Sequence, residues 1–178
     1  MIFKLSILQF AVFERQHAIV HMLLKRGFND IVMLGCSKMT PLHQASSNND
    51  VVMVELLLEY GANIEAQDDN MMTPLHTAVL WGHCQVVRIL LDNGANLKAR
   101  TCWKPDDMSI ICRSATPMQI ACSERGPRHA IIRDMLQRHQ EDMEHAVMMG
   151  QHPRLGFSSQ LSRLDPELLR LIVESARM

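Results

Sequence analysis

Apolar residues recur along this chain in two kinds of block, and each kind returns after 33 positions. In the first kind, two apolar residues lie three positions apart, which places them on one face of a helix. In the second kind, three consecutive apolar residues precede a glycine by three positions. The first kind comprises Leu42 with Ala45 and Leu75 with Ala78, and the second comprises 56–58 and 89–91. This fixed period predicts a solenoid of stacked helix pairs, because one pair cannot bury its apolar face alone.

The ends of the predicted helices carry matching signals in successive repeats. Thr40-Pro41 and Thr73-Pro74 precede the first helix of each pair. A threonine hydroxyl satisfies a free backbone N–H at the N-cap, and proline suits the first turn. Gly61 and Gly94 stand where the second helices must end, and glycine adopts the left-handed conformation of a C-cap. Each unit is therefore predicted to be a helix, a turn, a second helix and an extended connection.

Four such units are predicted in residues 1–140, and the first and last are degenerate. The first has no Thr-Pro pair, and the fourth follows an insertion near 100–113 and has no terminal glycine. A helical C-terminal extension is predicted at 141–178, with its first helix at 141–149. The predicted helices of the four units lie near 5–13, 17–26, 41–48, 51–60, 74–81, 84–93, 117–123 and 129–138.

The repeated motifs resemble those of the ankyrin repeat family. Thr40-Pro41-Leu42-His43-Gln44-Ala45 and Thr73-Pro74-Leu75-His76-Thr77-Ala78 match the family's Thr-Pro-Leu-His motif, and Thr116–Ala121 is a weaker copy. The resemblance covers roughly residues 5 to 139 and implies an all-α ankyrin repeat solenoid. It also implies that His43 and His76 are structural, with each side chain hydrogen-bonded to the neighbouring turn.

The resemblance further implies a non-catalytic protein that binds a partner protein along a concave face, formed by hairpin tips and first helices. Trp81 is the leading candidate for a binding hot spot, since tryptophan is enriched at such sites. The alternative is that Trp81 packs on the adjoining hairpin at Met72. Trp103, on the inserted loop, is the second candidate. The positions that match the family's contact positions are Met39, Ser47, Asn48, Asn70, Met72, Leu80 and Trp81, with Cys36, Ser37, Asp69, Ala115, Ser123 and Glu124.

The hairpin tips depart from the family pattern. A glycine usually stands two positions before the Thr-Pro pair in ankyrin repeats. Lys38, Met71 and Ser114 occupy that place here. The resemblance therefore predicts that the tips are reshaped.

The C-terminal extension suggests a second kind of function. Residues 164–172 are similar to the opening of an F-box, which docks onto ubiquitin-ligase cores, although Pro166 lies one place late and only about a third of a box is present. This similarity implies a ubiquitin-ligase substrate adaptor that docks through Leu168, Leu169 and Ile172. The alternative is an amphipathic helix that caps the last repeat, because these three side chains fall on one helical stripe.

Composition narrows the range of partners and compartments. The net charge of −1 argues against a dedicated nucleic-acid binder, because neutralising phosphates needs a basic surface. No apolar run is long enough to span a membrane. The run at 5–13 has no cleavage site after it, so we interpret it as a repeat helix rather than a signal peptide. The five cysteines are odd in number and favour a reducing intracellular compartment, namely the cytoplasm. We expect a monomer.

The sequence contains no motif that predicts catalysis or a cofactor. It has no phosphate-binding glycine loop and no nucleophile elbow. Cys102 and Cys112 flank the inserted loop and could close a disulfide or join a metal site with histidines nearby. Their spacing matches no zinc-type ligand pair, so we expect two thiols and no metal.

Overall fold

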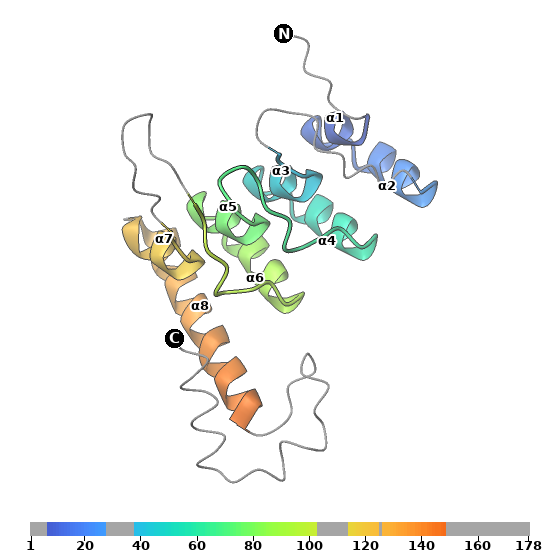
Figure 1. Cartoon of the computed structure of the whole chain (residues 1–178). Helices are drawn as coiled ribbons and strands as arrows, with labels where there is room; N and C mark the ends of the chain where they lie inside the picture. Colours follow the sequence, from blue (N-terminus) through green and yellow to red (C-terminus); the bar gives the residue numbers. More distant parts are fainter. Residues whose placement is uncertain (1–6, 28–37, 103–113, 125, 149–178) are drawn as a thin grey trace, which may run out of the picture. The chain divides into compact units, whose positions relative to one another are not determined.

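The α-helix is the only regular secondary structure in the part of the chain that the structure describes. The structure is a computed structural model, and it describes residues 7–27, 38–102, 114–124 and 126–148. The chain divides into two compact units, residues 1–133 and 134–178. The described ranges contain eight helices and no strand (Figure 1). The helices are α1 (Ile7–Phe13), α2 (His17–Lys25), α3 (Pro41–Ser47), α4 (Val51–Glu59), α5 (Pro74–Leu80), α6 (Cys84–Asp92), α7 (Pro117–Ser123) and α8 (Pro127–Met148).

The first seven helices lie where the sequence predicts them, within two residues at each end. The prediction of separate helices near 129–138 and 141–149 is wrong, because α8 runs without a break from Pro127 to Met148. No glycine or proline interrupts this segment after Pro127. Polar side chains four residues apart also bond along its surface, including Gln137 to Glu141 at 3.0 Å and Gln140 to Glu144 at 3.1 Å. The predicted domain boundary at 140/141 therefore lies inside a helix.

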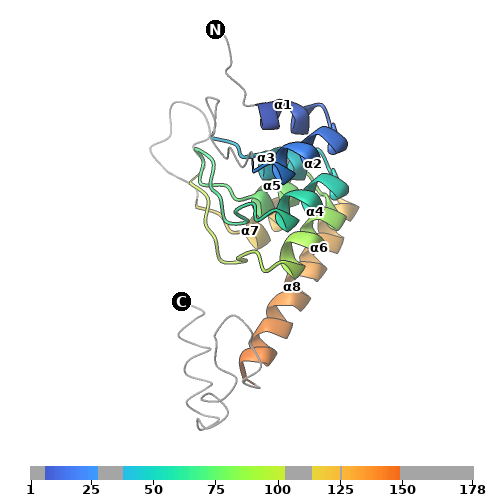
Figure 2. The ribbon, with the colours of Figure 1, turned by 90° about the vertical axis from the view of Figure 1, so that its right-hand side faces the viewer.

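The helices of the first unit form two adjacent rows. The first helices α1, α3, α5 and α7 pack in sequence order, and α2, α4 and α6 form the second row. The connections that follow α4 and α6 lie on one side of α3 and α5, and the second row lies on the other side (Figure 2). The core between the rows is apolar, and its fully buried side chains include Leu42, Met53, Leu75, Val79 and Leu90.

The repeated motifs act as helix caps, as the sequence predicts. Thr40 and Thr73 are the N-caps of α3 and α5, and each forms a reciprocal capping box with the histidine three positions on. Gly61 and Gly94 follow α4 and α6 with φ angles of +78° and +82°. The Gly61 N–H donates to the carbonyl of Leu58, which satisfies one of the free carbonyls at the helix end.

The tip residues Lys38 and Met71, which stand where the family usually has glycine, adopt the left-handed conformation. Their φ angles are +46° and +56°. The tip between α4 and α5 is closed by Asp68, whose carboxylate accepts the N–H groups of Asn70 and Met72, both at 2.8 Å. A left-handed conformation costs a residue with a Cβ about 1–2 kcal/mol. These tips therefore hold a strained backbone.

Replacing Met71 with glycine is expected to raise the free energy of unfolding by about 0.5–1 kcal/mol. Glycine removes the left-handed strain, and its greater freedom in the unfolded chain offsets part of the gain. The measurement is the urea midpoint at fixed slope. Gln67→Gly, at an exposed position of the same connection, is the control and is expected to lose about 0.5 kcal/mol. Equal losses in both variants would show that Met71 is not strained.

Candidate binding surface

Seven of the sequence-predicted contact residues lie at two kinds of position, the tips before α3 and α5 and the C-terminal ends of these helices. We call these positions together the hairpin face. Ser47 and Asn48 end α3, and Leu80 and Trp81 end α5. Met39, Asn70 and Met72 belong to the tips that precede α3 and α5. All of these side chains are half-buried except Trp81.

Trp81 is the most exposed aromatic residue of this surface. It is the C-cap of α5, and its backbone N–H donates to the carbonyl of Thr77, while the next N–H, that of Gly82, donates to the carbonyl of Val79. The backbone is therefore fixed by the helix, whereas 60% of the residue is open to solvent. Such an exposed indole on a rigid support can fill an apolar pocket of a partner at little entropic cost.

The ends of the first helices are held by side chains from the neighbouring repeats. The Nε2 atom of His83 lies 3.0 Å from the Ser47 carbonyl, and that of His129 lies 3.3 Å from the Leu80 carbonyl. The guanidinium of Arg15 donates to the carbonyl of Asn48. Each bond fixes a peptide group next to a contact residue. The hairpin face is therefore preorganised.

Backbone carbonyls of the hairpin tips also accept hydrogen bonds from other segments of the chain. The side-chain amide of Gln9 donates to the Met39 carbonyl at 3.2 Å, and Nε2 of His43 lies 2.8 Å from the Met72 carbonyl. The Cys102 N–H donates to the carbonyl of Asn70 at 2.7 Å. Between two neighbouring tips, Lys38 and Asp69 form an exposed ion pair of 3.2 Å, which contributes less than about 1 kcal/mol.

The buried histidines of the motif have one defined tautomer. The Nδ1 atom of His76 accepts the N–H of Thr73 at 3.1 Å, so the proton resides on Nε2, which donates to the Ala99 carbonyl at 3.1 Å. His43 is bonded in the same way. Burial lowers the pKa of His76 to about 4, although the bond to Ala99 opposes the shift, and burial also lowers the pKa of His43. Both side chains are therefore neutral structural groups at pH 7.

Several predicted residues fall outside the described chain. These are Trp103, Cys36, Ser37, Cys112 and the proposed docking residues Leu168, Leu169 and Ile172. In the described ranges, no three His, Cys, Asp or Glu side chains gather in a way that could hold a metal ion. No helix among those described has the length and apolar character needed to cross a membrane. A mostly apolar pocket lined by Leu8, Leu24 and Tyr60 contains none of the predicted contact residues.

The structure adds two apolar side chains that the sequence analysis did not place among the contacts. Phe13 ends α1, as Ser47 ends α3 and Leu80 ends α5, and it is 58% exposed. Met71, at the strained tip, is 44% exposed. Extending the repeat to the first unit, 34 positions before α3, would have identified Phe13. Treating Met71 as a replacement for the family's glycine drew attention to its backbone and away from its side chain.

Comparisons with known proteins identify the family of the chain. The sequence pattern of ankyrin repeats, in three copies, matches residues 8–101. The chain belongs to the ankyrin repeat family. A search of curated proteins gave no match. Among solved structures, the chain is similar to the crystal structure of the ankyrin repeat domain of Bcl-3, described as a unique member of the IκB protein family. The identity is 31% and the TM-score 0.62, over 75% of this chain and 51% of that chain.

The family membership settles the fold and the general role. The all-α ankyrin fold predicted from the Thr-Pro-Leu-His motifs is confirmed. Ankyrin repeats are non-catalytic protein–protein interaction modules, and this array is such a module. The chain spans about half the length of the Bcl-3 chain that it matches. The ankyrin pattern ends at residue 101, so the docking role of the C-terminal extension remains a prediction.

Proposed function

We propose that this protein binds one partner protein through the hairpin face of its ankyrin array, with Trp81 at the centre of the contact. The observation that carries the proposal is the 60% exposure of Trp81 beside half-buried contact residues on a fixed backbone. The other contact residues are Met39, Ser47, Asn48, Asn70, Met72 and Leu80. No catalytic step is part of this role. A cytoplasmic location belongs to the proposal and rests on the odd number of cysteines.

The chemistry of the hairpin face indicates what the partner presents. Its contact side chains are apolar or carry uncharged hydroxyl and amide groups, and none of the seven is ionised. The nearest tip charges, Lys38 and Asp69, are paired with each other. Methionine side chains adapt to irregular apolar shapes. A partner segment with apolar side chains and a few hydrogen-bonding groups fits this surface best.

Trp81→Ala is expected to weaken partner binding by roughly 2 kcal/mol, the loss typical of a hot-spot residue. The unfolding free energy is expected to change little, because most of the indole is already in water. The measurement is affinity capture from cell lysate with mass spectrometry, followed by titration of the purified partner. Val52→Ala, at a 58% exposed apolar position on α4, is the control and should keep the partner. If both variants retain the partner, the binding surface does not include Trp81, and the loop around Trp103 is the next candidate.

The adaptor alternative is tested in the same capture experiment. A chain that ends at Gly150 lacks Leu168, Leu169 and Ile172 but keeps every residue of the array. Loss of ubiquitin-ligase subunits from this truncated bait alone would assign the extension to docking. If the truncation keeps every partner while Trp81→Ala loses the main one, the protein is a binding scaffold. If the triple substitution of these residues by alanine lowers stability, the extension is a capping helix.

A further inference from the structure

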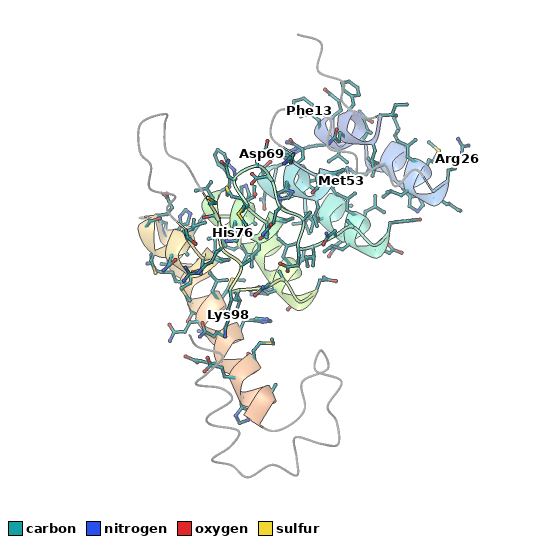
Figure 3. All side chains as sticks on the ribbon, in the orientation of Figure 1. Phe13, Arg26, Met53, Asp69, His76 and Lys98 are labelled. Carbon is teal, nitrogen blue, oxygen red and sulfur yellow. The ribbon has the colours of Figure 1, made fainter. Side chains whose placement is uncertain are left out.

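The outer surface of the first repeat carries a cluster of large apolar side chains in contact with water. We call it the end face, and it comprises four residues of α1 and α2. Their exposed fractions are 73% for Ile7, 56% for Phe10, 42% for Ile19 and 53% for Met22. Phe13, which Figure 3 labels on α1, adjoins them and is 58% exposed. Contiguous exposed apolar clusters on folded domains commonly mark an interaction site.

The equivalent positions in later repeats show what this surface is built to contact. Ile19 is the third residue of α2, as Met53 is of α4 and Val86 of α6. Met53 and Val86 are completely buried, because a preceding repeat packs against them. Ile7 similarly occupies the first helical position, where later repeats have buried prolines. The end face therefore corresponds to the surface by which each later repeat stacks on the repeat before it. In the described chain, no repeat covers this surface of the first unit.

In a solenoid, such a surface is either covered by a further repeat or belongs to a repeat that is polar on its outer side. The end face has no such character, since none of its four residues is polar. A stacking surface of this kind fits another helix pair of the same architecture. A second copy of this chain offers one, because its own end face is apolar and needs the same cover.

We propose that two copies of this protein associate through their end faces in a symmetric dimer. From the exposed fractions and typical side-chain areas, the four residues expose on the order of 400 Å² of apolar surface per copy. Since interfaces between identical chains are about 65% apolar, two such faces correspond to roughly 1,200 Å² of total burial. That total lies at the lower end of the range of specific, stable interfaces, about 1,200–2,000 Å².

Charge does not oppose this association. None of the end-face residues is ionised, and the net charge of −1 produces little repulsion between identical chains. A dimer replaces the monomer that the sequence alone predicts. The dimer leaves the hairpin face around Trp81 available for the partner proposed above. Each of the two proposals can therefore be refuted without affecting the other.

The test is the molar mass of the full chain by sedimentation equilibrium across the micromolar range. We expect the wild-type chain to approach twice its single-chain mass as concentration rises. Phe10→Gln combined with Ile19→Gln is expected to weaken association at least tenfold. Glutamine is chosen because Gln44 occupies the position of Phe10 in the second repeat. Val52→Gln, at an exposed apolar position of α4, is the control and is expected to dimerise as the wild type does.

Urea unfolding separates the remaining outcomes. A dimer predicts a wild-type midpoint that rises with protein concentration and a variant midpoint that does not. Wild-type protein of single-chain mass at every concentration overturns the proposal. If that monomer also loses stability in the Phe10 and Ile19 variant, the end face is covered within one copy. Dimerisation unaffected by the variant overturns the proposal as well, because the dimer then uses another surface.

Discussion

Replacing His76 with alanine is expected to lower the free energy of unfolding by about 3 kcal/mol. The side chain is completely buried, with Nδ1 2.8 Å from the Thr73 hydroxyl and 3.1 Å from the Thr73 nitrogen. Its Nε2 atom donates to the Ala99 carbonyl. Alanine leaves these polar groups without a partner in a region with little water, and it opens a cavity beside Leu75. Unsatisfied buried groups cost about 1–3 kcal/mol, and the cavity adds to that loss.

The chain itself provides the matched variant for this test. Glutamine stands at the same motif position in the first and fourth repeats. There the amide of Gln9 donates to the Met39 carbonyl, and the side-chain oxygen of Gln119 accepts the Thr116 N–H at 2.9 Å. One glutamine can therefore make both kinds of bond, and His76→Gln is expected to lose only about 1 kcal/mol. Urea unfolding measures all variants.

The exposed position of the fourth repeat supplies the second control. Gln119→Ala removes a capping bond at the surface, where water satisfies the freed N–H, so a loss below about 1 kcal/mol is expected. The loss of unfolding free energy should therefore be largest for His76→Ala and smaller for His76→Gln. The loss for Gln119→Ala should not exceed that for His76→Gln. If His76→Ala and Gln119→Ala lower the free energy of unfolding equally, the burial of His76 is not the cause of its larger expected loss.

The sequence predicted those features of the fold that depend only on residues within one repeat. The caps at Thr40 and Gly61 and the buried histidines follow from local motifs, because a helix end is satisfied by residues within a few positions of it. Family resemblance supplied the contact positions, and the structure shows which of them are exposed. The role of these positions in binding remains a prediction.

Features that depend on contacts between neighbouring repeats could not be predicted from local motifs. His129 bonds to the Leu80 carbonyl across 49 positions, and no motif connects the two residues. The exposure of Ile19 depends on whether another repeat packs against it, since Met53 at the equivalent position is buried. The continuous helix α8 was missed because the repeat period imposed a break that its residues do not support. Solenoid stability and surface both arise from interfaces between neighbours.

Lowering the pH from about 7 to about 4 is expected to destabilise the array by roughly 3 kcal/mol or more. In the unfolded chain, histidine has a pKa near 6.5, whereas burial lowers the pKa of His76 in the folded chain to about 4. Between these values the unfolded state binds a proton that the folded state excludes, so stability falls as the pH falls. The contribution of His76 is complete above about pH 6.5 and is lost by about pH 4. His43 acts in the same direction, because burial lowers its pKa too.

Urea unfolding across this pH range measures the loss, and His76→Gln assigns its cause. The variant keeps a side chain that can make the same kinds of bond but cannot titrate, so its stability is expected to fall less steeply than that of the wild type between about pH 6.5 and 4. Gln119→Ala also removes a capping bond and involves no titrating group, so it should lower stability by the same amount at every pH. A wild type and a His76→Gln variant with parallel pH profiles would show that the acid sensitivity arises from other groups. If the profiles converge toward pH 4, the protonation of one buried imidazole accounts for the acid sensitivity of the array, because a proton on Nδ1 of His76 removes the acceptor of the Thr73 N–H at the N-cap of α5.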